Sequence, residues 1–167
     1  MNKGLHWQER HVLSILPHPD DEAFGFSGTL MRYRQNQVPV SHVCATLGEM
    51  GRNMGQPPIA NRETLPLIRK GELYESLLRM GVDQLYLLGR HDKMLEFEDL
   101  DELADQIGQI MEAVNPSVIY TFYPGLGVHQ DHDALSWAVV RAVSRLNAGE
   151  RPRLLCRPVV RDAENRL

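Results

Sequence analysis

The chain has 167 residues, of which 43% are hydrophobic and 24% are charged, and its formal net charge at pH 7 is −4. A chain of this size can bury the core of one globular domain, so we expect a single domain over residues 1–167. Lys and Arg are scattered along the chain, which excludes nucleic acid as a partner. No apolar run reaches about 18 residues, which excludes a membrane as a partner. Because the N-terminus also lacks a secretory signal, we expect a cytoplasmic protein.

Apolar runs of strand length alternate along the chain with longer segments of helical period. Strands are predicted where Val, Ile, Leu and Tyr form nearly continuous runs, at 11–16, 40–47, 84–88 and 117–123, with a further one at 153–160. Helices are predicted where apolar residues recur three or four apart, at 21–36, 62–80, 98–114 and 132–146. This alternation predicts an α/β fold, a Rossmann-like arrangement of three α/β/α layers around a mostly parallel sheet.

The stretch SILPHPDDEAFGFSGTL, residues 14–30, places His18 and the consecutive acids Asp20, Asp21 and Glu22 directly after the first predicted strand. Ligands of open parallel sheets bind beyond the carboxyl ends of the strands. Three adjacent carboxylates repel one another and are tolerated when they are solvated, cap a helix or meet a cation. Capping needs only one acid, so this stretch alone leaves a capped helix start and a metal or catalytic site as equal alternatives.

The stretch YPGLGVHQDHDALSWAV, residues 123–139, has the same layout, with His129, Asp131 and His132 opening a helix after a strand. Both clusters therefore converge on one edge of the sheet. A histidine and a carboxylate from one loop with a histidine from the other give three ligands and leave a coordination position open, as catalytic zinc requires. The remaining carboxylate and imidazole suit proton transfer and oxyanion stabilisation. Two capped helix starts with incidental histidines are the alternative.

PHPDDE at 17–22 together with HQDH at 129–132 resembles the LmbE-like, or PIG-L-type, zinc-dependent N-deacetylases. Further segments resemble the second paralogous type of bacillithiol-biosynthesis deacetylase: TLGEMGRNMG (46–55), RETLPLIRKGEL (62–73), DKMLEFE (92–98) and NPSVIYTFYPG (115–125). The resemblance covers residues from about 10 to 146. It implies the LmbE-like deacetylase fold.

The resemblance also implies a role for each motif residue. It implies that zinc, with Fe²⁺ as an alternative, is bound by His18, Asp21 and His132. Asp20 would act as general base, and His129 would face the substrate carbonyl with Asp131 holding its imidazole.

Arg69 matches an arginine that approaches an anionic part of the substrate in the resembled deacetylases. The carboxylate of a malate group would suit the two-pronged guanidinium. An exposed helix arginine paired with Glu72 or Glu63 is the alternative.

Glu49 follows the second predicted strand and is expected to hydrogen-bond sugar hydroxyls, with a solvated loop acid as the alternative. His91 and Asp92 follow the third strand and are expected at the same edge of the sheet. The family more often has Arg before that Asp, which leaves the role of His91 open. Three histidines match no motif and are expected to be structural or to lie at the surface: His6, His11 and His42.

The resemblance implies a hydrolase that removes the N-acetyl group from a small acetylated amino-sugar conjugate, N-acetylglucosaminyl-malate of bacillithiol biosynthesis. The alternatives are another acetylated amino sugar, a cysteinyl-glucosamine conjugate, or a metal-binding homologue with little turnover. The resemblance fades after about residue 150, where family members continue further. A shortened chain is therefore expected, less stable and less active than a longer one or dependent on a homo-oligomer to cover the gap.

Overall fold

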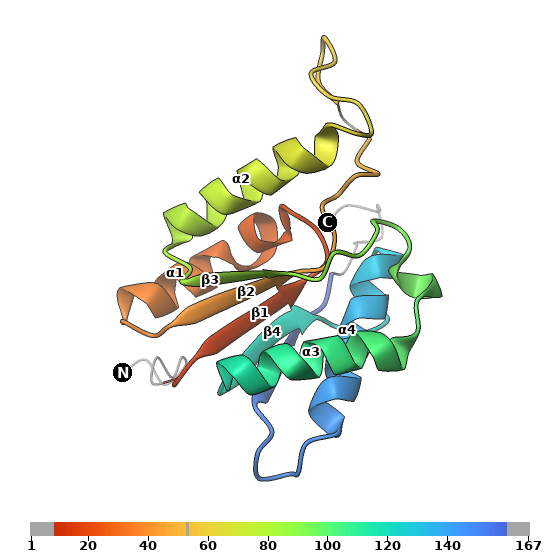
Figure 1. The fold of residues 1–167 in the computed structure, drawn as a ribbon. Helices are drawn as coiled ribbons and strands as arrows, with labels where there is room; N and C mark the ends of the chain where they lie inside the picture. The colour runs from red at the N-terminus through yellow and green to blue at the C-terminus, as the bar shows by residue number, and fades with distance from the viewer. Residues whose placement is uncertain (1–8, 53, 160–167) are drawn as a thin grey trace.

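A computed structural model describes residues 9–52 and 54–159 and contains one five-stranded sheet (Figure 1). The strands are β1 (Val12–Leu16), β2 (Val40–Cys44), β3 (Gln84–Leu87), β4 (Val118–Phe122) and β5 (Arg153–Arg157). Their order is β3-β2-β1-β4-β5, and every neighbouring pair is parallel. The predicted mostly parallel α/β sheet is thus confirmed.

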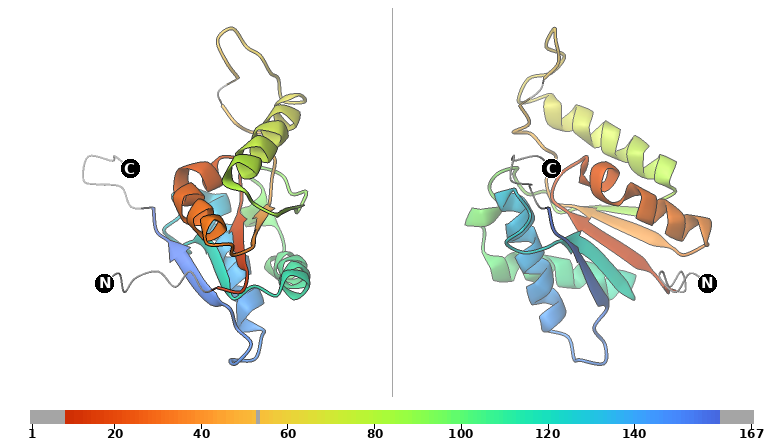
Figure 2. Two further views of the ribbon diagram at one scale, coloured as in Figure 1. Left: turned by 90° about the vertical axis from the view of Figure 1, so that its left-hand side faces the viewer. Right: turned by 180° about the vertical axis from the view of Figure 1, so that it is seen from behind.

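Four α-helices cover the two faces of this sheet. They are α1 (Ser27–Gln35), α2 (Leu65–Met80), α3 (Leu100–Val114) and α4 (Gln130–Ser144). Helices α1 and α2 lie on one face, and α3 and α4 lie on the other, as the views from the side and from behind also show (Figure 2). The predicted three-layer arrangement is therefore present.

The core is divided into two layers by the alternation of side chains along each strand. Leu13 and Ile15 of β1 pack in a cluster with residues of α3 and α4, whereas Val12 and Leu16 pack in a cluster with residues of α1 and α2. Because both faces of β1 are covered, all of its side chains are buried and its sequence is almost continuously apolar.

Several helix boundaries differ from the prediction. The segment predicted as one helix over 21–36 begins as a π-helical turn, Glu22–Phe26, before α1. Helix α2 begins at Leu65 rather than at 62, because the Asn61 side chain accepts the backbone N–H groups of Glu63 and Thr64 at 2.9 Å each and forms a turn there. Helix α4 begins two residues early, at Gln130.

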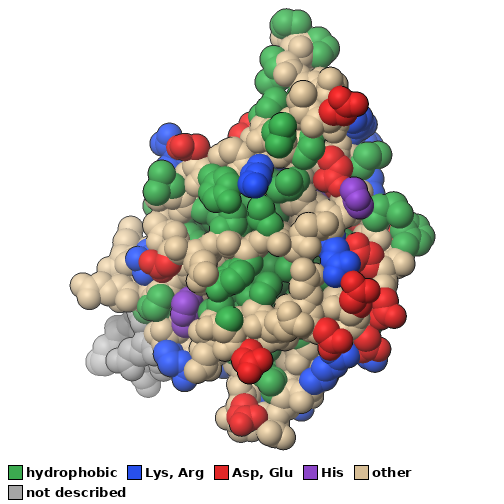
Figure 3. Space-filling model, in the orientation of Figure 1, with side chains coloured by type: hydrophobic (Ala, Val, Ile, Leu, Met, Phe, Trp, Pro, Cys, Tyr) green, Lys and Arg blue, Asp and Glu red, His purple; other side chains and the backbone are tan. Residues whose placement is uncertain are grey.

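The surface carries charges of both signs. On the face drawn in Figure 3, acidic and basic side chains are interspersed rather than separated. Arg145, directly after α4, lies 2.6 Å from Asp105 of α3, for example. Among residues 9–52 and 54–159, no helix has the length and apolar character needed to cross a membrane.

His42 in β2 is fully buried in the sheet. The pairing of β2 with β1 places it next to Ser14. Its Nδ1 lies 2.8 Å from Ser14 Oγ, while its Nε2 has no hydrogen-bond partner. His11 directly precedes β1, with its Nε2 2.9 Å from Ser41 Oγ. The structural role expected for these two histidines is consistent with these contacts; His6 lies outside the described residues.

We expect His42 to make the fold sensitive to acid. Burial lowers the pKa of His42 to about 4, whereas the unfolded residue titrates near 6.5. The unfolded chain therefore binds the extra proton between these values, so stability falls as the pH falls from about 6.5 through 4. When the pH is lowered from 7 to 4, the free energy of unfolding measured with urea should fall by about 3 kcal/mol less in His42→Leu than in the wild type. Equal losses in the two proteins would contradict this role.

Candidate functional site

The loops that follow β1, β2, β3 and β4 meet at the carboxyl edge of the sheet around a cavity of about 330 Å³. This is the edge at which open parallel sheets bind ligands. The charged and imidazole side chains that line the cavity are His18, Asp20, Asp21, Arg52, Arg69, Asp92, Lys93, His129 and His132. Segments far apart in the sequence thus supply one polar site.

His18, Asp21 and His132 form a group that could hold a metal ion. One donor atom from each lies within 4.8 Å of the other two. The Asp21 carboxylate lies between the rings, with one oxygen 3.5 Å from His18 Nδ1 and the other 3.3 Å from His132 Nε2. Two imidazole nitrogens and one carboxylate oxygen are a ligand set used by catalytic zinc sites, so the residues present fit a divalent metal.

A second group of possible ligands shares His18 with the first. It consists of His18, Asp92 and His129, whose donor atoms also lie within 4.8 Å of one another. One Asp92 oxygen is 3.2 Å from His18 Nε2, and the other accepts the backbone N–H of Met50 at 2.9 Å. Sequence reasoning placed Asp92 at this edge but did not identify it as a possible ligand.

The electrostatics of the cluster favour a positive charge at its centre. Burial alone would lower the pKa of His18, but the carboxylates of Asp131, Asp21 and Asp92 outweigh it and raise this pKa to about 11. Burial would raise the pKa of Asp21, yet its contacts with His132 and His18 lower it well below its usual range. Three carboxylates around one imidazole create a negative potential that would also attract a metal cation.

Asp20 projects into the cavity from a backbone conformation that few non-glycine residues adopt, with φ of 125°. Its carbonyl accepts the N–H groups of Ala23 and Phe24 at 2.9 and 3.0 Å, which stabilises this turn. Burial and the neighbouring Asp21 carboxylate raise the pKa of Asp20, while Arg69 opposes the shift. Unusual backbone conformations of this kind cluster at functional sites.

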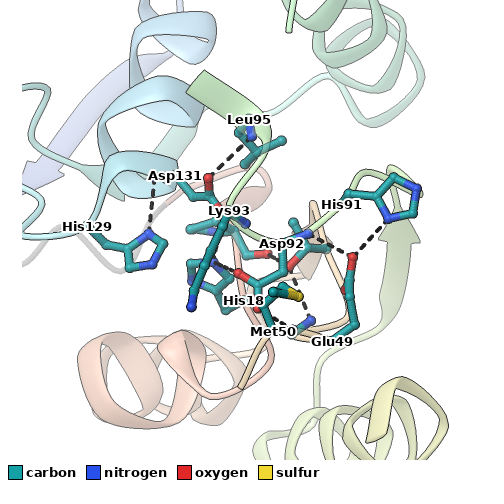
Figure 4. Close-up of polar contacts among 12 residues, drawn as sticks. His18, Glu49, Met50, His91, Asp92, Lys93, Leu95, His129 and Asp131 are labelled. Atoms are coloured by element: carbon teal, nitrogen blue, oxygen red, sulfur yellow. Dashed lines mark hydrogen bonds and ion pairs between the residues drawn. The ribbon is translucent and has the colours of Figure 1, made fainter. Parts of the chain in front are cut away.

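His129 caps the N-terminus of α4 and turns its ring toward the cavity. Its Nδ1 accepts the backbone N–H of Asp131 at 3.1 Å (Figure 4). The ring centroid of His129 lies 4.8 Å from that of His18 and 5.5 Å from that of His132. Burial and the charge of His18 lower the pKa of His129, while the Asp131 carboxylate opposes this.

The Asp131 carboxylate is directed toward His18, which corrects the expected pairing with the His129 ring. Asp131 is fully buried, and its Oδ2 lies 3.1 Å from His18 Nε2. The same carboxylate accepts the backbone N–H groups of Lys93 at 2.6 Å and Leu95 at 3.3 Å. These donors come from the loop after β3 and hold the side chain beside His18 (Figure 4). The spacing of residues in the sequence could not reveal this contact.

Arg69 lines the cavity from α2 and contacts the backbone carbonyl of Pro19. Its Nη2 donates to Asp20 Oδ2 at 2.8 Å, and its Nε lies 3.5 Å from Glu72. Arg69 is thus brought to the site, and the Glu72 contact expected for a surface arginine is present as well.

Glu49 is not among the residues that line the main cavity. Its carboxylate lies 3.1 Å from His91 Nδ1 and accepts the backbone N–H of Asp92 at 2.8 Å, to one side of the cluster (Figure 4). His91 is itself exposed and lies with Glu49 at a neighbouring depression. The structure therefore separates both residues from the histidine cluster, and a contact of Glu49 with sugar hydroxyls stays a prediction.

The family described as GlcNAc-PI de-N-acetylase, PIG-L, matches residues 13–143 of the chain. The proteins named "Probable N-acetyl-alpha-D-glucosaminyl L-malate deacetylase 2" of Bacillus subtilis (strain 168) and of Bacillus cereus are 53% and 57% identical to it, over 156 and 144 residues. These alignments cover 93% and 86% of the chain. The chain in turn spans 71% and 66% of the two relatives' lengths.

Solved structures of similar proteins share the fold. N,N'-diacetylchitobiose deacetylase from Pyrococcus horikoshii is 27% identical with a TM-score of 0.73, over 82% of this chain and 50% of that one. The conserved protein TT1542 from Thermus thermophilus is 28% identical with a TM-score of 0.68, over 86% of this chain and 63% of that one. The chain thus spans between half and two thirds of these two proteins.

Proposed function

The chain belongs to the GlcNAc-PI de-N-acetylase (PIG-L) family, and we propose from this that it hydrolyses the N-acetyl group of N-acetylglucosaminyl-malate to give the free amine and acetate. One observation carries the proposal: His18, Asp21 and His132 form a possible metal site in a cavity that Asp20 and His129 also line. We place this reaction, a step of bacillithiol biosynthesis, in the cytoplasm.

In this proposal His18, Asp21 and His132 hold one divalent metal, which we take to be zinc. When bound, such a metal polarises a substrate carbonyl and makes water a better nucleophile near neutral pH. Mixed nitrogen and oxygen ligands discriminate weakly among first-row metals, so Fe²⁺ would also fit the site.

Asp20 is proposed as the general base. It lines the cavity next to the ligand Asp21, and its carboxylate can accept a proton from the attacking water. Arg69 donates to one of its oxygens at 2.8 Å and so fixes the orientation of the carboxylate. The hydrogen bond that His129 Nδ1 accepts from the Asp131 backbone orients the ring of His129 and leaves its hydrogen on Nε2, which would donate a hydrogen bond to the developing oxyanion. The proton that Asp20 takes from water would pass to the departing amine.

Arg69 is proposed to recognise the malate part of the substrate. Arg69 lines both the main cavity and a second cavity of about 420 Å³, and Asp20 also lines both. A bound carboxylate could take up donors of Arg69 other than those that contact Asp20, Pro19 and Glu72.

Arg69→Ala should therefore raise KM more for N-acetylglucosaminyl-malate than for plain N-acetylglucosamine, because only the conjugate offers a carboxylate. The effect corresponds to the loss of a charge-assisted hydrogen bond, about 1.5–3 kcal/mol or roughly 10- to 150-fold in KM. Steady-state kinetics on both substrates measures the selectivity. Equal changes in KM for the two substrates would assign Arg69 to the sugar or to packing around Asp20.

A second candidate substrate is another N-acetylated amino sugar, which the 27% identity to a diacetylchitobiose deacetylase favours. Acetate release from N-acetylglucosaminyl-malate, N-acetylglucosamine, N,N'-diacetylchitobiose and an acetylated cysteinyl-glucosamine conjugate separates these possibilities. The proposal requires the highest kcat/KM on the malate conjugate. A higher kcat/KM on diacetylchitobiose would replace the substrate but keep the reaction, and no acetate from any of the four would refute the proposed hydrolysis.

A further inference from the structure

The loop between β4 and α4 is tied to the first turn of α4 by one carboxylate. Asp133 Oδ1 accepts the backbone N–H groups of Gly125 and Gly127, each at 2.9 Å. The backbone of Gly125 has φ of 80°, a conformation that glycine adopts without the strain of a side chain. The carboxylate therefore holds a turn of the loop in place directly above the helix.

The same loop holds the ring of His132. The carbonyl oxygen of Gly127 lies 2.8 Å from His132 Nδ1. A carbonyl can only accept a hydrogen bond, so Nδ1 carries a hydrogen and Nε2 is the nitrogen directed at Asp21, at 3.3 Å. The ring also stacks on Phe122, with centroids 3.9 Å apart and planes 6° apart. Together these contacts fix both the tautomer and the rotation of the ring.

The loop and the helix are packed too closely at Gly127 for any side chain. A Cβ added to Gly127 would lie 2.5 Å from His132 Cβ and 2.9 Å from Asp133 Oδ1. The Gly127 carbonyl can reach His132 only because the backbone approaches the helix this closely. Asp133 accepts the backbone N–H of Gly127, so it holds the residue that carries this carbonyl.

We propose that Asp133 is a positioning residue of the metal centre: by holding Gly127, it fixes the carbonyl that orients His132 Nε2 toward the metal position. The proposal rests on the proposed function in taking His132 as a ligand. Asp133 does not line the cavity and acts only through Gly127 and His132. Partners that orient a metal-bound histidine in this way commonly change metal affinity by about 10- to 100-fold when they are lost.

Zinc affinity, measured by competition with a chromophoric chelator, tests this role in the full chain. Asp133→Ala should bind zinc about 10- to 100-fold more weakly than the wild type. Asp133→Asn keeps the accepting oxygen and should stay within a few-fold of the wild type. Asp99→Ala is a matched control, because Asp99 also accepts two backbone N–H groups, at 2.7 and 3.2 Å, but lies outside the cavity. This control should lose thermal stability and keep its zinc affinity.

The outcomes separate this inference from the proposed function. Wild-type affinity in Asp133→Ala, or equal losses in the Ala and Asn variants, would overturn the positioning role while leaving the metal site intact. A wild-type chain that binds no zinc would refute the proposed metal centre and the role with it. If Asp133→Ala does not fold, Asp133→Glu decides: it keeps the charge but moves the oxygens, so it should bind zinc more weakly than Asp133→Asn. Equal affinities would contradict the proposal.

Discussion

Replacing His18, Asp21 or His132 with alanine is expected to abolish stoichiometric metal binding and, with it, turnover. Each substitution removes one of only three protein ligands, and the Asp21 carboxylate lies within 3.5 Å of both rings. The loss of Asp21 would also remove a carboxylate from beside His18. Metal content of the purified variants, measured by mass spectrometry after gel filtration, should fall from about one ion per chain to a small fraction.

The overlapping group His18, Asp92 and His129 provides the control for this prediction. Asp92→Ala removes a carboxylate that lies 3.2 Å from a His18 nitrogen, closer than the 3.5 Å of Asp21, but that is not in the proposed ligand set. It should therefore keep the metal. Loss of metal in Asp92→Ala with retention in Asp21→Ala would place the ion in the other group, and full occupancy in all three ligand variants would refute the assignment. Bound Fe²⁺ in place of zinc would not contradict the assignment of the three ligands.

Asp20→Asn is expected to keep the metal but to lower kcat by roughly 10²–10⁴-fold, because an amide cannot take up the proton of the attacking water. The asparagine oxygen can still accept the hydrogen bond from Arg69, so the loop geometry should persist. His129→Ala should lower kcat by roughly 10²–10³-fold, since the developing oxyanion would lose its hydrogen-bond donor. Measurement of kcat together with metal content in the same preparation tests both variants.

Metal content separates the possible explanations of a low rate in these variants. A variant that loses both metal and activity would identify its residue as a ligand instead of an acid or base. Near-wild-type kcat on the best substrate would show that the proposed role is wrong. Asp101→Asn, at an exposed residue of α3 that does not line the cavity, is a suitable control and should change neither quantity.

The fold could be predicted because local sequence and global architecture agree. The continuous apolar run at β1 requires helices on both faces, and the alternation with amphipathic segments requires parallel crossovers. What remained unpredicted were boundaries set by single side chains, such as the Asn61 turn that delays α2 to Leu65. The π-helical start at Glu22 has no periodic signal in the sequence.

The convergence of His18, Asp21 and His132 could be predicted because both motifs follow strands that end at the same edge of a parallel sheet. The partner of Asp131 could not. Its carboxylate pairs with His18 and with backbone N–H groups of the loop after β3, and such contacts depend on side-chain direction rather than on spacing. Asp92 carried only a weak signal, its place at the end of the third strand. Its closeness to His18 required the fold.

Acetate release from N-acetylglucosaminyl-malate by the same preparation, first stripped of metal and then reconstituted with one equivalent of zinc, tests the central claim most directly. We expect no acetate from the metal-free chain, recovery of turnover that saturates at one zinc per chain, and no recovery in Asp21→Ala under the same conditions. Undiminished acetate release from the stripped protein, or full recovery in Asp21→Ala, would contradict a deacetylase whose metal is held by His18, Asp21 and His132.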